Sequence, residues 1–201
     1  MRKIVLAALG SLVLAAVIVL GLRWLAGEPQ TTAALAEVTI GGPFTLTDQN
    51  GRRVSDEEFR GRLMLVYFGY TFCPDVCPLG LTTIADALDA LPPAVQDQVV
   101  PVFITVDPER DTAAVLHDYV PQFSPRLIGL TGSEAEIAAA LRAYRVYAAK
   151  SDAPAPDGDY TVDHSTVTYL MGRDGRYLTH FGHGTTPEDM ATSIAKLAAE
   201  S

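Results

Sequence analysis

Apolar residues in this chain form short continuous runs that alternate with longer segments of helical spacing. The run from Leu63 to Tyr70, LMLVYFGY, contains β-branched and aromatic residues, which predicts a strand covered on both faces. Apolar side chains then recur every three or four residues in the segment from Leu79 to Leu91. This spacing predicts a helix, and Pro92 and Pro93 end it.

The same alternation continues toward the C-terminus. The pattern predicts a strand, a helix, a strand and a further helix, at Val102–Val106, Thr112–Val120, Leu127–Leu130 and the segment after Ser133. Ser133 and Glu136 form a capping box at the start of that last helix. Repeated alternation of strands and helices is typical of an α/β sheet.

Two turn dipeptides predict a β-hairpin at each end of this series. Asn50-Gly51 and Asp174-Gly175 both suit tight hairpin turns, because their residues tolerate positive φ. The flanking runs are Phe44–Thr47 with the stretch around Val54, and Thr166–Met171 with Arg176–Phe181.

The sequence also predicts a loop before the second hairpin and a helix after it. A polar, proline-rich segment from Ser151 to Gly158 predicts a loop. Thr186 as N-cap, followed by Pro187, predicts a final helix near the C-terminus.

The N-terminus carries a long apolar run that predicts a membrane anchor. Arg2 and Lys3 precede an uncharged segment from Ile4 to Leu22, which is long enough to span a bilayer. A cleaved signal peptide is the alternative, with Ala34-Leu35-Ala36 as its processing site. The positive charges before the run favour a cytoplasmic N-terminus and export of the rest.

This pattern divides the chain into three parts. Residues 1–27 are predicted to be the anchor, or an uncleaved signal, 28–39 a tether, and 40–201 a single folded domain. The predicted location is a bacterial cytoplasmic membrane, crossed once, with the C-terminal domain in the periplasm.

Charge excludes one class of partner. The chain has 15 basic and 24 acidic residues, and removing the basic residues that flank the apolar run leaves 12 against 24. A surface this acidic repels nucleic acid.

The only two cysteines, Cys73 and Cys77, are the first candidates for chemistry. Pro78 disfavours a helical conformation at Cys77 and suits a first helical position, which predicts Cys77 near the N-cap of the helix. Unpaired N–H groups and the helix dipole there favour thiolates. The spacing is compatible with a redox disulfide, a small structural disulfide or a two-thiolate metal chelate, and spacing alone does not choose between them.

A third metal ligand has to come from elsewhere in the chain. His164 lies at the mouth of the strand predicted from Thr166 and is the leading candidate. His180 and His183 in THFGHG are alternatives, although a glycine-containing hairpin end explains them adequately. His117 is assigned to a structural or solvated position.

Three separated segments strongly resemble the Sco/SenC family, whose members deliver copper to cytochrome c oxidase. They are FGYTFCPDVCPLGL at Phe68–Leu81, VFITVDPERDT at Val102–Thr112 and VDHSTVTYL at Val162–Leu170. The resemblance covers about 44–198. It implies a thioredoxin-like fold with an added N-terminal hairpin, and copper held by Cys73, Cys77 and His164. Asp107 and Asp111 match another family segment and are interpreted as loop and helix-cap residues.

Two functions from different classes follow from the resemblance. The first is a metallochaperone that carries Cu(I) to the dinuclear site of oxidase subunit II. Whether it also carries Cu(II) stays open, as does its copper donor, for which another envelope copper chaperone is the candidate. The second is a thiol-disulfide oxidoreductase that uses Cys73 and Cys77 to reduce the oxidase's ligand cysteines. A copper or redox sensor and a peroxidase are weaker alternatives. Two thiolates and one imidazole form a soft, three-ligand set that suits Cu(I).

Overall fold

The computed structural model describes residues 14–22, 39–154 and 160–200. The chain divides into two compact units, Met1–Val38 and Thr39–Ser201. Residues 14–22 of the first unit are helical. Among the described helices, none combines the length and the apolar character needed to cross a membrane. The predicted anchor and tether fall largely outside the described residues and stay predictions.

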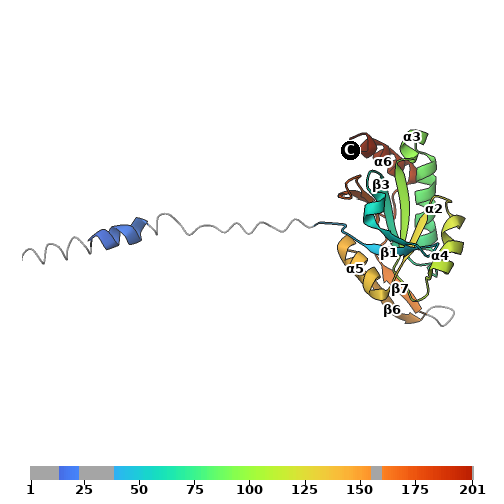
Figure 1. Cartoon of the computed structure of the whole chain (residues 1–201), viewed down its shortest axis with the longest axis horizontal. Helices are drawn as coiled ribbons and strands as arrows, with labels where there is room; N and C mark the ends of the chain where they lie inside the picture. Colours follow the sequence, from blue (N-terminus) through green and yellow to red (C-terminus); the bar gives the residue numbers. More distant parts are fainter. Residues whose placement is uncertain (1–13, 23–38, 155–159, 201) are drawn as a thin grey trace, which may run out of the picture. The chain divides into compact units, whose positions relative to one another are not determined.

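A mixed seven-stranded sheet forms the centre of the second unit, in the order β2-β1-β5-β4-β3-β8-β9 (Figure 1). The strands are β1 (Thr45–Asp48), β2 (Arg53–Ser55), β3 (Leu63–Gly69), β4 (Val99–Thr105), β5 (Ile128–Thr131), β8 (Thr168–Met171) and β9 (Tyr177–Phe181). The three middle strands are parallel, whereas the β1–β2 and β8–β9 hairpins join in antiparallel fashion at the two sides. Both predicted hairpins are confirmed.

The helices follow the predicted order with one addition. They are α2 (Val76–Asp89), α3 (Pro93–Gln96), α4 (Ala113–Tyr119), α5 (Glu134–Tyr144) and α6 (Pro187–Glu200), with 3₁₀ turns η1 (Asp56–Phe59) and η2 (Val120–Gln122). The capping box predicted at Ser133 and Glu136 is present, and Thr112 caps α4. The sequence pattern does not predict the short helix α3, because Pro93 indicates the end of one helix, although proline also suits the first position of a new one.

Alternating side chains of β3 contact helices on opposite faces of the sheet. Tyr67 stacks on Phe103, which contacts Tyr119 at the end of α4, and Tyr67 also lies against Gly80 of α2. Phe68 points to the other face, where its ring meets Tyr144 of α5 at 5.2 Å between centroids. Every residue of β3 and β4 is buried, so both strands are apolar at nearly every position.

Strand β4 is longer than its apolar pattern predicted. It begins at Val99, which pairs with Leu63, rather than at Val102. The sequence pattern did not predict this earlier start, because Pro101 lies within the strand and proline is unusual in a central strand. It is accommodated before the pairing with β5 begins, at Val102 opposite Ile128.

A separate two-stranded sheet, β6 (Ala148–Pro154) and β7 (Tyr160–His164), follows α5. Arg145 ends α5 in the left-handed conformation, with φ of 57°, and the chain then enters β6. The prediction of a loop from Ser151 was wrong as far as Pro154. Both strands are rich in polar residues, so they lack the apolar pattern by which the main-sheet strands were recognised.

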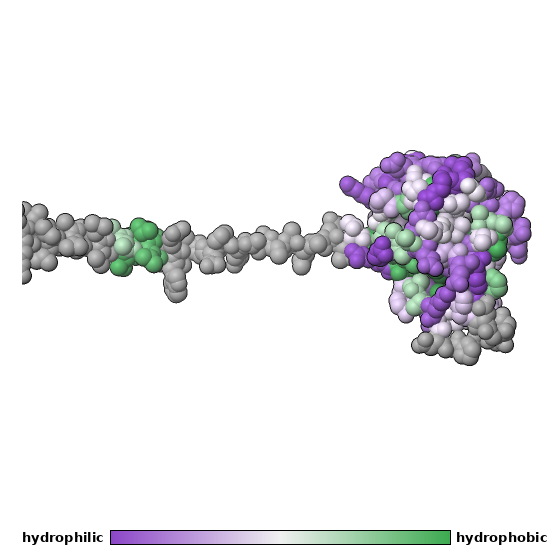
Figure 2. Space-filling model, turned by 60° about the horizontal axis from the view of Figure 1, so that its bottom comes forward, coloured by the Kyte–Doolittle hydropathy of each residue, from purple (hydrophilic) through white to green (hydrophobic). Residues whose placement is uncertain are grey.

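The surface of the folded unit is mixed. The face drawn in Figure 2 is largely hydrophilic, and its hydrophobic side chains lie in small separate groups.

Candidate metal centre

The two cysteines lie where β3 leads into α2. After β3 ends at Gly69, the chain turns through a short loop containing Cys73, and Asp75 occupies the N-cap position of α2. Cys77 is therefore the second residue of the helix, which confirms its predicted position near the N-cap. The predicted start of the helix at Leu79 was wrong, because α2 begins three residues earlier, at Val76. Pro78 is accommodated inside the first turn, where its missing N–H would have had no intrahelical partner.

Both sulfur atoms are shielded from solvent and neither is in a disulfide. The backbone N–H of Cys77 donates to Cys73 Sγ at 3.4 Å. Gly69 allows this close packing, since a Cβ there would lie 2.8 Å from Cys77 Sγ. The site therefore depends on a residue without a side chain at the end of β3.

The two thiols differ in acidity. The pKa of Cys73 is lowered to about 4, mainly by a side-chain hydrogen bond with Cys77 and also by backbone N–H groups at the helix start. The pKa of Cys77 is raised, because Cys73 holds the negative charge of the pair and because the Cys77 side chain is fully buried. The thiolate form is thus favoured at Cys73 over Cys77, and a bound metal would supply the charge needed to remove the second proton.

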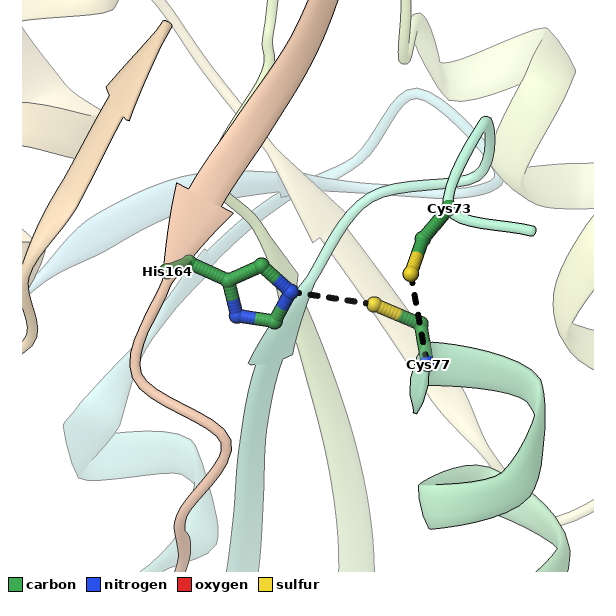
Figure 3. A group of neighbouring side chains, drawn as sticks. All are labelled: Cys73, Cys77 and His164. Carbon is green, nitrogen blue, oxygen red and sulfur yellow. Dashed lines mark hydrogen bonds between the residues drawn. The ribbon is translucent and has the colours of Figure 1, made fainter. Parts of the chain in front are cut away.

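His164 reaches the cysteines from a different strand than expected. It is the last residue of β7 in the small sheet, whereas the sequence placed it at the mouth of a strand beginning at Thr166. Its Nε2 lies 3.2 Å from Cys77 Sγ (Figure 3). Its Nδ1 lies 3.0 Å from the carbonyl oxygen of Ser165, which can only accept, so Nδ1 carries the proton and Nε2 presents a lone pair toward the sulfur atoms.

Cys73, Cys77 and His164 could hold one metal ion together. Their ligand atoms lie within 4.8 Å of one another, and no other such cluster of three or more occurs in residues 14–22, 39–154 and 160–200. A trigonal site with bonds of about 2.3 Å separates its ligand atoms by about 4 Å. Only small shifts are therefore needed: separations up to 4.8 Å would shorten, and the 3.2 Å between His164 Nε2 and Cys77 Sγ would lengthen. A hollow of about 290 Å³ borders Cys73 and His164 and gives access from solvent.

A buried carboxylate fixes the loop that carries Cys73. Asp111 accepts hydrogen bonds from the backbone N–H of Thr71 at 3.0 Å, from the Thr71 hydroxyl at 2.5 Å and from the Thr105 hydroxyl at 2.6 Å. Burial raises the pKa of Asp111, and these hydrogen bonds offset only part of that effect. Asp111 is not the helix cap predicted from the sequence: Thr112 is the cap, and Asp111 supports the cysteine loop.

A second carboxylate supports the strand that carries His164. Asp107 accepts from the Tyr160 hydroxyl at 2.8 Å and from Arg110 Nε at 2.5 Å. Neither Arg110 nor Tyr160 was recognised from the sequence. The segment VFITVDPERDT marks Arg110 as one of several charged residues that directly follow a buried strand, but it does not reveal the partner of Arg110 and does not include Tyr160.

The remaining histidines lie outside this cluster. His180 stacks on Tyr177, whose hydroxyl lies 2.5 Å from its Nδ1. His183 borders a small hollow next to Gly80 and Met190, and His117 lies in the last turn of α4. The structure therefore favours His164 over the alternatives that the sequence left open.

Comparisons with known proteins agree with this architecture. The family model described as SCO1/SenC matches residues 32–199. The human mitochondrial SCO1 homolog is 41% identical over 172 residues, covering 84% of this chain and 56% of the relative. The chain spans about half the length of the curated mitochondrial relatives that it matches.

Solved structures extend the comparison to the fold. Copper-bound ScoI from Bradyrhizobium japonicum is 50% identical and has a TM-score of 0.71, covering 78% of this chain and 98% of that chain. A more distant match is BsSco, described as having a disulfide switch and as a member of the Sco family of cytochrome c oxidase assembly proteins. It is 28% identical, with a TM-score of 0.61, covering 81% of this chain and 94% of that chain. The α/β fold with its N-terminal hairpin, expected from the resemblance, is confirmed.

Proposed function

The chain belongs to the SCO1/SenC family, and from this premise we propose that it is a copper metallochaperone. It holds copper through Cys73, Cys77 and His164 and delivers it to the dinuclear copper site of cytochrome c oxidase subunit II. Residues 1–27 anchor it in a bacterial cytoplasmic membrane, with the folded unit in the periplasm and residues 28–39 as the tether.

The observation that carries this proposal is the convergence of two sulfur atoms and one imidazole nitrogen within 4.8 Å. Soft thiolates with an imidazole suit Cu(I), and the imidazole also suits Cu(II). A structural zinc site normally has four protein ligands, and this cluster supplies three. The open position gives an incoming ligand from an acceptor protein a place to attack.

The surroundings of the cluster support transfer between proteins. Three large hydrophobic side chains are exposed close to the proposed ligands: Phe72 by 54%, Leu79 by 51% and Tyr147 by 63%. Phe72 precedes Cys73, Leu79 lies two residues after Cys77, and the backbone of Tyr147 pairs with Ser165 beside His164. Exposed apolar side chains this near the ligands in the chain suit transient docking of a copper donor, such as another envelope chaperone, and of the oxidase subunit.

The ligand assignment is tested by copper stoichiometry and affinity in Cys73→Ala, Cys77→Ala and His164→Ala. Each variant is expected to bind copper more weakly than the wild type, because two ligands remain of three; His164→Ala keeps both thiolates and can still be loaded with Cu(I). His180→Ala is the matched control, since it also removes an imidazole from the same unit, and it is expected to bind copper normally. Full, tight binding by all three ligand variants would refute the assignment.

Delivery is tested separately, by oxidase assembly in cells. Cells that contain only His164→Ala are expected to lack the dinuclear copper signal of the oxidase, while His180→Ala restores it.

The proposed anchor is tested by the double substitution Leu14→Asp and Val17→Asp. This variant is expected to leave the membrane fraction on gentle extraction.

The acidity of Cys73 specifically favours the second candidate, a thiol-disulfide oxidoreductase. Its thiolate would attack a disulfide of the oxidase subunit, and the buried Cys77 would then displace the second sulfur and close a disulfide. Two electrons pass from the cysteine pair to the substrate disulfide, and an external thiol reductant restores the pair. His164→Ala separates the two functions: reductase activity that persists while oxidase assembly fails indicates copper delivery, and unaffected assembly indicates the thiol enzyme.

A further inference from the structure

The proposed ligands come from two parts of the unit that share no sheet. Cys73 and Cys77 follow β3 of the seven-stranded sheet, whereas His164 ends β7 of the small sheet. The position of the imidazole therefore depends on contacts between side chains of the two parts. Arg110, in the segment between β4 and α4, makes several of these contacts.

The guanidinium of Arg110 lies among aromatic rings from both parts. Its Cζ is 3.7 Å from the ring centroid of Tyr160, the first residue of β7. The same atom is 4.7 Å from the centroid of Phe72 and 5.7 Å from that of Tyr70, both in the segment leading to Cys73. All three distances are within the range of cation–π attraction. One planar cation thus bridges the loop of Cys73 and the strand of His164.

Polar contacts fix this guanidinium in place. Arg110 Nε donates to Asp107 Oδ2 at 2.5 Å, and Nη1 donates to the carbonyl oxygen of Tyr160 at 3.0 Å. The Tyr160 hydroxyl donates to the other oxygen of the same Asp107 carboxylate. The side chain of Arg110 is only 12% exposed, so water competes little for these contacts.

We propose that Arg110 is a positioning residue: by bridging Phe72 and Tyr160 it holds His164 against the two cysteines and sets how slowly the imidazole leaves the copper. It does not touch the metal. The inference rests on the copper site proposed above. A planar guanidinium is required, because an ammonium group at this position keeps the charge but neither stacks between rings nor donates to two acceptors in one plane.

Copper release from the full-length chain tests this role. Cu(I)-loaded protein is mixed with excess bathocuproine disulfonate, and the absorbance of the chelator complex gives the release rate. Arg110→Gln is expected to release copper about tenfold faster than the wild type, and Arg110→Lys to fall between them. Arg126→Gln is the matched control, since Arg126 also donates to backbone carbonyls, of Gln96 and Val99, which lie outside the loop of Cys73 and the strand of His164. It is expected to release copper at the wild-type rate.

A double-mutant cycle separates positioning from general stability. In a His164→Ala background, Arg110→Gln is expected to cause no further acceleration, because the group that it positions is gone. The urea midpoint of each metal-free variant is measured alongside. Acceleration of the same size in both backgrounds would overturn the inference, as would wild-type release by Arg110→Gln, or equal release by the Arg110 and Arg126 variants.

The outcomes also distinguish this inference from the proposal on which it rests. If His164→Ala alone releases copper at the wild-type rate, the ligand assignment fails. If His164→Ala accelerates release and Arg110→Gln does not, the assignment stands and only the role of Arg110 fails.

Discussion

The cysteine-bearing and histidine-bearing parts of the site are built differently. The cysteine part is continuous with β3, in which every residue is buried and which pairs with β4 and β8 along its length. The histidine part is a small sheet whose strands pair with each other, and only one of the five residues of β7 is buried. Identifiable side-chain contacts through Tyr70, Asp107 and Arg110 connect it to the cysteine part.

The difference separates a fixed part of the site from an adjustable one. The thiolates are placed by the core, which changes only at a large cost in stability. The imidazole is placed by a few contacts, each of which contributes on the order of 1 kcal/mol. A carrier that must both retain and release copper benefits from having one ligand on the less firmly held element.

The largest expected contrast comes from truncating one aromatic residue in each part. Phe68→Ala removes a fully buried ring that packs on Tyr144 and Tyr169, and it is expected to cost about 3–5 kcal/mol of unfolding free energy. Tyr160→Ala in β7 is expected to cost less than half as much. Urea unfolding of the metal-free variants measures both. Equal losses would show that the small sheet is part of the cooperative core and would remove the distinction.

Hydrogen exchange tests the same contrast without any substitution. Amides of β3 are expected to exchange only through global unfolding, whereas those of β7 also exchange through local opening. The expected difference is at least about 100-fold for the metal-free protein, and it is expected to shrink when Cu(I) ties His164 to the cysteines. Equal protection of the two strands in the metal-free protein would contradict this picture.

The same contrast explains how much of the fold could be predicted from the sequence. The strand at Leu63–Tyr70, the hairpins around Asn50-Gly51 and Asp174-Gly175, and the capped helix after Ser133 were recognised because buried elements and turns impose strong patterns. Strands β6 and β7 were missed because a strand pair with few buried apolar residues has no such pattern. The start of α2 was predicted at Leu79 but lies at Val76, because Pro78 fits more than one position of the first turn of a helix.

The residues of the candidate site also differ in how far they could be predicted from the sequence. Cys73 and Cys77 stand out from spacing and residue type, but His164 is 87 residues from Cys77. Its place before a predicted strand was only a weak local signal, and the resemblance was needed to assign it as a ligand. Arg110 and Tyr160 could not be assigned, because their role exists only where a loop after β4 meets β7. Long-range contacts of this kind have no signature in a single sequence.

A substitution of Asp111 tests the cysteine part with a smaller expected loss of unfolding free energy. Asp111→Asn replaces an acceptor of three hydrogen bonds from Thr71 and Thr105, and it is expected to cost about 1–3 kcal/mol. The loss is expected in the metal-free protein, together with faster exchange of the Thr71 amide. Asp118→Asn, on the surface of α4, is the control and is expected to be neutral.

The pH dependence of this variant has a defined sign. Burial raises the pKa of Asp111 in the folded state, so as the pH rises the carboxyl ionises first in the unfolded chain. The wild type therefore loses stability between the unfolded and folded pKa values, whereas the Asp111→Asn variant has no carboxyl at this position and would show no such loss. The variant Asp111→Asn is expected to be less stable than the wild type by a larger unfolding free energy at about pH 4 than at about pH 7, as measured by urea unfolding. A deficit that grows with pH would contradict this account.

The smallest expected effect is in the histidine part, at its exposed charge pair. Lys150 Nζ lies 2.6 Å from Glu109 Oε2, but both side chains are 57% exposed, so solvent and salt screen the pair. Lys150→Gln is expected to change the rate of Cu(I) release by less than about twofold, and the change should vanish in about 0.5 M salt, where the screening length falls below about 5 Å. Lys150 and Arg110 are both cations near the ring of Tyr160. Comparing their variants therefore distinguishes the effect of positive charge at this ring from the effect of the planar guanidinium of Arg110. Release as fast as that of Arg110→Gln would mean that net charge at the ring, and not the planar bridge to Phe72, holds the imidazole in place.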